Sequence, residues 1–112
     1  MVNQVMLVGR VSADPELREL PSGDLLGVCR LVVPRTEVRL LPSGKKSSSV
    51  DVVDLAAWGP RARRSMAGWR AGDEVAIEGS LRRRFYSAGG RTASRVEVEL
   101  SSGRLVRRAK NE

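Results

Sequence analysis

One short stretch of the chain, SLRRRFYSAGGR at residues 80–91, combines cationic and aromatic side chains. Successive side chains of a strand point to opposite faces, so Arg82, Arg84 and Tyr86 share one face, and Phe85 lies on the other. Guanidinium groups contact phosphates while a ring stacks on a base, a combination typical of proteins that bind single-stranded nucleic acid. The alternative is a hydrated hairpin on which Tyr86 only shields the turn. Phe85 is expected to pack within the fold or against another subunit.

The two tryptophans differ in what their positions predict. Trp58 ends an apolar strand face just before Gly-Pro, so both a core role and a base-stacking role stay open. Trp69 recurs at helical spacing after Ala62 and Met66, which predicts a place on the buried face of a helix. Cys29, in an apolar strand, is expected to be a small core residue.

Other side-chain chemistry is sparse. The chain has no histidine, the commonest general base and a common metal ligand. Glu97 and Glu99 face one way along a strand, as a solvated row would, and no phosphate-cradling GxxxxGK[ST] sequence occurs. The single cysteine forms neither an intrachain disulfide nor a cysteine pair for zinc. We therefore predict no enzyme activity, no cofactor and no metal site; a hydrolase built on paired carboxylates is the remaining enzymatic alternative.

The net charge of +7 arises in the second half of the chain. Seven basic and seven acidic residues precede Pro60, whereas thirteen basic and six acidic residues follow it. Such an excess favours binding to a polyanion or to an anionic membrane surface. Only Lys45, Lys46 and Lys110 among the 20 basic residues are lysines, and a GC-rich genome would produce the same arginine excess without any function.

The periodicity predicts one all-β domain. The strand over 2–11 has two partly buried faces, and Val75, Ile77, Gly79 and Leu81 point inward in a later strand. Strands are expected over 2–11, 25–40, 49–58, 73–86 and 95–106, with a short strand near 14–21 and one helix between Gly59 and Gly72. This order indicates an OB-fold, a five-stranded Greek-key barrel with one short helix between the third and fourth long strands. The domain should span 1–107, followed by a disordered end at 108–112.

The cellular setting follows from what the sequence lacks. No basic segment followed by an apolar stretch opens the chain, and no run approaches the ~20 apolar residues of a membrane span. Together with the lone cysteine, this predicts a soluble protein of the reducing cytoplasm with no membrane partner.

Several spaced segments resemble the bacterial single-stranded DNA-binding proteins over residues 2–106. They are NQVMLVGRVSADPELRELPSG, AAWG, RAGDEVAIEGSLRRRFY and GGRTASRVEVEL. The opening segment is the most specific, and residues 71–86 match the family's KGxxVxVEGxLxxRxW pattern with Tyr86 in place of tryptophan.

The resemblance implies an OB-fold homo-oligomer, usually a tetramer, without enzyme activity. It implies that the protein binds and protects single-stranded DNA, independent of sequence, in replication, recombination and repair, in association with the nucleoid. Trp58 and Tyr86 match stacking rings of the family, whereas Val38 and Val52 stand where rings are usual. Lost stacking would cost about 2–6 kcal/mol unless arginines compensate, which would make binding unusually salt-dependent.

Phosphate contacts are predicted in two groups. Arg82 and Arg84 follow from strand geometry, whereas the other four depend on an arm that the 34–48 hairpin would form over the strand: Arg35, Arg39, Lys45 and Lys46. The chain stops at RRAKNE, where relatives commonly carry an acidic tip, so we expect a tail-less member in which tail-mediated recruitment of repair proteins is unlikely. Two alternatives stay open: an oligomer that lost most of its DNA affinity and acts as a protein-interaction module, and an RNA-binding OB protein.

Overall fold

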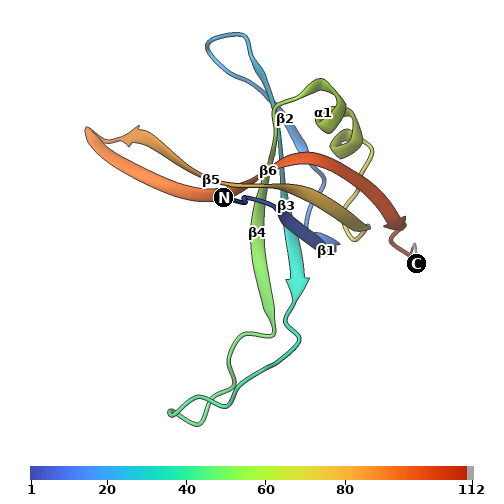
Figure 1. Cartoon of the computed structure of the whole chain (residues 1–112), viewed down its shortest axis with the longest axis vertical. Helices are drawn as coiled ribbons and strands as arrows, with labels where there is room; N and C mark the ends of the chain where they lie inside the picture. Colours follow the sequence, from blue (N-terminus) through green and yellow to red (C-terminus); the bar gives the residue numbers. More distant parts are fainter. Residues whose placement is uncertain (111–112) are drawn as a thin grey trace.

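The computed structural model describes residues 1–110, which form six strands and one helix (Figure 1). The elements in chain order are β1 (Val5–Val11), β2 (Glu16–Glu19), β3 (Leu25–Pro34), β4 (Val50–Ala57), α1 (Pro60–Ala67), β5 (Glu74–Ala88) and β6 (Arg91–Arg107). The predicted all-β class and the short helix after the third long strand are confirmed.

Five of the strands close into a barrel. Their order is β1-β5-β6-β4-β3, and a pairing between β1 and β3 closes the ring at Arg10 opposite Val32. The β4–β6 contact is parallel, at Leu55 opposite Val98, whereas the other pairings are antiparallel. The short strand β2 pairs only with β3 and so extends the sheet outside the ring. This is the five-stranded barrel of an OB-fold, as predicted.

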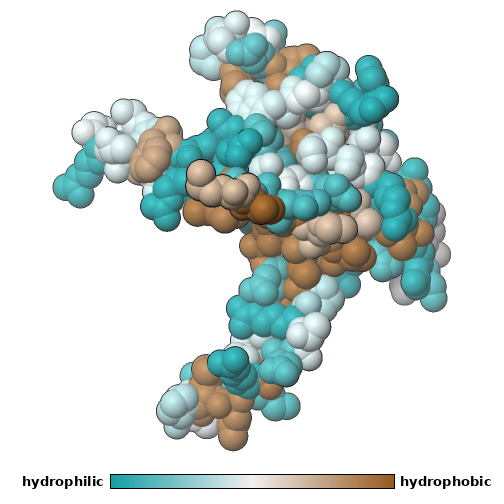
Figure 2. Space-filling model, in the orientation of Figure 1, coloured by the Kyte–Doolittle hydropathy of each residue, from teal (hydrophilic) through white to brown (hydrophobic). Residues whose placement is uncertain are grey.

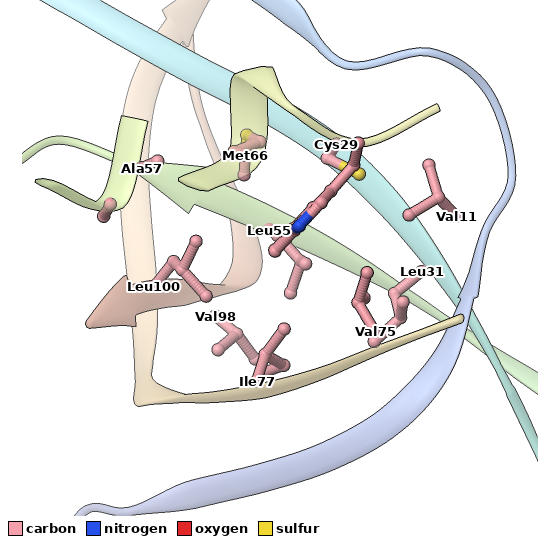
Figure 3. Packing of buried hydrophobic residues seen from close by; sticks show 12 residues of the cluster. Val11, Cys29, Leu31, Leu55, Ala57, Met66, Val75, Ile77, Val98 and Leu100 are labelled. Carbon is pink, nitrogen blue, oxygen red and sulfur yellow. The ribbon is translucent and has the colours of Figure 1, made fainter. Parts of the chain in front are cut away.

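The barrel interior is filled by aliphatic side chains that alternate along the strands (Figure 3). Leu31, Leu55 and Val75 are completely or almost completely buried, and Met66 of α1 packs against this cluster at one end of the barrel. Cys29 is buried as predicted, and burial raises the pKa of its thiol to about 11. The thiol is therefore protonated and unreactive at neutral pH.

The helix is shorter than the sequence predicts. Gly59 precedes it with an extended backbone, and Pro60 suits its first turn because proline needs no backbone donor there. It ends at Ala67, and the N–H of Gly68 bonds to the carbonyl of Ser65. Trp69 is buried as predicted, but it lies beyond the helix, and its ring packs closely over Gly103 of β6.

Two strands leave the barrel as a long hairpin (Figure 1). The turn between β5 and β6 consists of Gly89 and Gly90, which both adopt positive φ, as a two-residue type I′ turn requires. Leu81 keeps the inward parity of Val75 and Ile77, but there the strand is already leaving the barrel. Leu81 therefore has the predicted parity, but it is half exposed, unlike Val75 and Ile77.

A second projection joins β3 to β4 and descends from the barrel in Figure 1. Paired backbone hydrogen bonds hold it as an arm, with the N–H of Leu41 on the carbonyl of Lys45 and the N–H of Ser47 on that of Arg39. The radius of gyration is 15.8 Å, whereas a compact domain of this length would have about 13 Å. The two projections thus extend the molecule well beyond its barrel.

The chain after β6 docks against Asp73, which is almost completely buried. Its carboxylate accepts hydrogen bonds from the backbone N–H groups of Arg70 (2.8 Å) and Ala109 (2.9 Å) and from the Arg108 guanidinium (2.8 Å). The predicted disordered end at 108–112 is therefore held in place at its first two residues. Residues 111 and 112 lie outside the described part, and the domain boundary stays a prediction.

Replacing Asp73 tests this anchor. Hydrogen bonds hold the pKa of Asp73 below its ordinary 3.8, and the bond from the Ala109 N–H has the largest effect; burial acts in the opposite direction. Because the folded state binds the proton less tightly, this stabilisation is complete above pH 3.8 and is lost as pH falls through the lower folded value. We expect Asp73→Asn to lower the free energy of unfolding by about 1.5–3 kcal/mol at neutral pH. In urea unfolding, the variant should lose less of its remaining free energy of unfolding between neutral pH and pH 2 than the wild type does. The same pH dependence in both proteins would contradict the anchor. Glu19→Gln, at an exposed position, is the control.

A second substitution tests barrel closure at Gly79 of β5. A Cβ at this position would lie 2.2 Å from the carbonyl oxygen of Glu99 and 2.8 Å from the Val98 side chain. We expect Gly79→Ala to destabilise the fold by about 3 kcal/mol, since β5 and β6 would have to separate. Gly68→Ala is the matched control, because its Cβ would make only an ordinary 3.5 Å contact. Equal urea midpoints for the two variants would contradict the close approach.

Candidate nucleic-acid interface

A groove of about 490 Å³ runs across the outer face of the barrel beside the base of the β5–β6 hairpin. Its walls come from the β1–β2 connection, β2, β3, β4 and the hairpin. Trp58 lies in it together with four arginines and four carboxylates: Arg18, Arg30, Arg84, Arg95, Asp14, Glu16, Asp54 and Glu97. The groove is therefore rich in guanidinium groups, yet their charge is balanced locally.

Arg84 and Trp58 lie against each other in the lining of this groove. The Arg84 guanidinium carbon lies over the Trp58 ring, 4.4 Å from its centroid, a cation–π contact. The same guanidinium donates to the carboxylate of Glu97, whose side chain is only 8% exposed. The prediction that Glu97 belongs to a solvated row is wrong, because Arg84 and the neighbouring strands cover it.

Trp58 itself is half-buried at the end of β4. Its backbone carbonyl accepts a hydrogen bond from Arg63 of α1, which ties the strand end to the helix. Its indole Nε1 is buried and has no hydrogen-bond partner. A buried donor without a partner costs roughly 1–3 kcal/mol, so the surroundings of this ring are not optimised for stability alone.

Asp54 links two further arginines of the groove. Its two carboxylate oxygens accept bonds from Arg30 (3.1 Å) and Arg95 (2.9 Å). Partial burial raises the pKa of Asp54, but the hydrogen bonds from Arg95 and Arg30 outweigh it and hold the pKa below its ordinary value. The carboxylate is therefore ionised at neutral pH and neutralises part of the arginine charge.

The predicted row on β5 lies on one face of the hairpin. Arg82 bonds to Glu99 at 3.3 Å, and this carboxylate is more exposed than Glu97. Tyr86 ends the row with 48% of its surface exposed. Phe85 points to the opposite face and is 70% exposed, so packing within this chain is excluded, and a subunit contact is the expectation that remains.

The arm residues fall into two groups. Arg35 is paired with Asp51 at 2.8 Å, where the hydrogen bond raises the pKa of the guanidinium. Within residues 1–110, the other three predicted phosphate contacts of the arm form no salt bridge: Arg39, Lys45 and Lys46. The arm and the groove do not form one pocket, since their lining residues differ.

The two positions without rings are exposed aliphatic residues. Val38 lies in the arm and Val52 on the outer face of β4, in register with Val32 of β3. Leu40 and Leu41 are also exposed, and Figure 2 shows apolar surface at the tip of the arm. These side chains offer contact area but no ring on which a base stacks.

Sequence reasoning missed Arg30, Arg95 and Asp54 as groove residues. Cross-strand register is the signal that would have found them, since Arg30 pairs with Asp54 and Arg84 pairs with Arg95. The pairing of β3 with β4 was implied by the long hairpin between them. The pairing of Arg84 with Arg95 could be predicted only from the exact position of the Gly-Gly turn, which sets the register of β5 against β6.

Residues 1–110, which the structure describes, lack two kinds of feature. They contain no group of three or more histidine, cysteine, aspartate or glutamate side chains placed to hold a metal ion. They also contain no helix long and apolar enough to cross a membrane.

Two curated relatives share sequence with this chain. A single-stranded DNA-binding protein of Treponema pallidum is 32% identical over 106 residues, 94% of this chain and 58% of that relative. Single-stranded DNA-binding protein A of Bacillus subtilis is 33% identical over 86 residues, 77% of this chain and 48% of its own length. The chain thus spans only about half to three-fifths of the length of these curated relatives.

A solved structure and a family model complete the comparison. The Plasmodium falciparum SSB complex with ssDNA superposes with a TM-score of 0.73, at 23% identity, over 96% of this chain and 95% of that one. This likeness supports the OB-fold. The model of the single-strand binding protein family matches residues 2–106, almost the whole sequence. The chain therefore belongs to the single-strand binding protein family.

Proposed function

We propose that this chain binds single-stranded DNA without sequence preference and without catalysing a reaction. The observation that carries the proposal is the exposed ring of Tyr86 in line with Arg82 and Arg84, beside an arginine-lined groove on an OB barrel. The names of the relatives and the DNA complex of the structural neighbour support it. Within the cell, such binding would protect single strands in the cytoplasm, at the nucleoid, during replication, recombination and repair.

The side chains of this surface suit sequence-tolerant binding. Every base has a π face, so a stacking contact to Tyr86 would depend little on the identity of the base and contribute about 1–3 kcal/mol. Guanidinium and ammonium groups would contact phosphates, which are the same at every nucleotide. The proposed phosphate contacts are Arg82 on the hairpin and four residues of the arm: Arg35, Arg39, Lys45 and Lys46.

The ion pairs reduce the salt dependence of DNA binding that the arginine excess alone would predict. Arg35 and Arg82 are already bonded to carboxylates, but these pairs are partly exposed and phosphate would replace the carboxylate at little cost. Arg39, Lys45 and Lys46 need no such exchange. Three to five phosphate contacts correspond to a slope of log affinity against log salt of about −2 to −4 for single strands. The salt dependence should thus be moderate rather than extreme, although Val38 and Val52 provide no rings.

We also propose that the chain assembles as a homo-oligomer, with four copies as the expected number. The outer face of β1 supports this, because Met6 and Val8 are exposed there although the sequence predicts partial burial. Figure 2 shows apolar surface where β1 crosses the barrel. Leu81, Phe85 and Val96 form a second exposed apolar surface, on the opposite side of the sheet from Met6 and Val8. Exposed apolar residues on adjoining strands are typical of protein interfaces.

The binding proposal is tested with a fluorescein-labelled dT oligomer and anisotropy at several salt concentrations. We expect tight binding at low salt, a slope of about −2 to −4, and weaker competition by duplex DNA of equal length. Tyr86→Ala should weaken binding by about 5- to 150-fold, whereas Tyr86→Phe, which keeps the ring, should bind as the wild type does.

The alternatives are separate outcomes of this titration. Absence of binding at low salt would contradict the proposal and favour a protein-interaction module. Stronger competition by an rU oligomer than by dT would instead indicate an RNA-binding protein, since the arrangement of rings and cations does not itself reject a 2′-hydroxyl.

Light scattering tests the assembly. Four chains of 12.2 kDa predict a molar mass of about 49 kDa. Val8→Asp should reduce this mass, because it places a charge on the exposed face of β1, whereas Leu40→Asp at the tip of the arm should leave it unchanged. A wild-type protein that is monomeric at micromolar concentration would contradict the assembly.

A further inference from the structure

From the geometry around Trp58 we infer that Arg84 is a base-stacking platform rather than a phosphate contact. A base would stack on the guanidinium that covers Trp58, and the indole beneath would support that guanidinium without touching the base. The inference rests on the proposed binding of single-stranded DNA and names the part that these two residues take in it.

The first reason is that the ring of Trp58 is already occupied. The Arg84 guanidinium carbon lies 4.4 Å from the centroid of the indole, so a base meets Arg84 before it meets this face of the ring. The Arg84 side chain is 38% exposed, which leaves part of it open to a ligand. Guanidinium planes stack on nucleobases much as aromatic rings do, and the contact adds a cation–π component.

The second reason is the cost of moving Arg84. Its partner Glu97 is almost completely buried, so a phosphate that took the guanidinium away would leave a buried carboxylate without its partner. Arg95, a nearby cation, is already bonded to Asp54 at 2.9 Å. A base that stacks on Arg84 leaves all these bonds in place, whereas a phosphate that draws the guanidinium off Trp58 and away from Glu97 would break the Arg84–Glu97 bond.

Arg82 differs from Arg84 in the burial of its carboxylate partner. It lies two residues earlier on the same face and is also bonded to a glutamate, but that glutamate, Glu99, is 35% exposed. Replacing Glu99 by a phosphate at Arg82 therefore costs little free energy, because water can solvate the released carboxylate. One strand face thus carries two arginines with different roles, set by the burial of their carboxylate partners.

Tyr86 extends the platform. Side chains two residues apart on a strand are separated by about 7 Å, roughly twice the 3.4 Å spacing of stacked bases. Two neighbouring bases that stack on Arg84 and Tyr86 must therefore separate from one another. The pair would hold the strand in an extended form, with Arg82 placed to contact a phosphate beside it.

The decisive variant is Arg84→Lys, which keeps the charge and can keep the ion pair with Glu97 but loses the planar group. In anisotropy titrations with a dT oligomer at several salt concentrations, we expect about 5- to 150-fold weaker binding with an unchanged salt slope. The matched Arg82→Lys should bind within about twofold of the wild type, and Arg82→Gln should make the slope shallower by about 0.7. Circular dichroism melting checks that each variant is folded.

The opposite pattern would overturn the inference. If Arg84→Lys binds as the wild type does while Arg84→Gln makes the slope shallower by about 0.7, Arg84 contacts phosphate. Failure of the wild type to bind any single strand would contradict the proposed function instead, so the two failures are distinguishable.

A second measurement needs no variant. A dT oligomer with 5-iododeoxyuridine at one position is irradiated in complex with the wild-type protein, and the cross-linked peptide is identified by mass spectrometry. We expect an adduct at Tyr86 and none at Trp58, because the guanidinium separates the indole from the base. An adduct at Trp58 would show direct contact and contradict the inference.

Discussion

The two-residue period of β5, which pairs with β6 along its length, is the constraint on which both the fold and the site depend. Inside the barrel this period is imposed by the core, because Val75 and Ile77 must point inward. The same strands continue beyond the barrel without a change of parity in β5, so the core also decides which side chains share a face of the hairpin. Arg82, Arg84 and Tyr86 lie together for this reason, and a shift of one residue would place all three on the other face.

The second organising feature is the pairing of cations with carboxylates. The chain carries a net charge of +7, yet the groove balances four arginines with four carboxylates. Burial of the carboxylate then decides how freely an arginine exchanges its partner. Glu97 is buried and keeps Arg84 on Trp58, whereas Glu99 is exposed enough to release Arg82. The arginine excess is thus a poor guide to phosphate contacts unless the partner of each arginine is known.

Much of the fold could be predicted from local pattern, and the site only in part. Alternation predicts the strands, and the Gly-Gly turn predicts the hairpin. The burial of Glu97 could not be predicted because it depends on Arg84 and the neighbouring strands, and Arg84 bonds to Glu97 only after β5 and β6 pair. Leu81 has the inward parity of a core residue, but the point at which a strand leaves a barrel depends on the tertiary fold. The place of Trp69 after the helix depends on where Gly68 ends it.

The central claim is that single-stranded DNA follows the outward row of the hairpin while the Arg84–Glu97 pair stays intact. A crystal structure of the chain with a dT oligomer tests this most directly. The account predicts a base against the Arg84 guanidinium, a second base on Tyr86, and Glu97 still bonded to Arg84. A strand that lies on the opposite face, over Phe85, or an Arg84 that has left Glu97 for a phosphate, would contradict it.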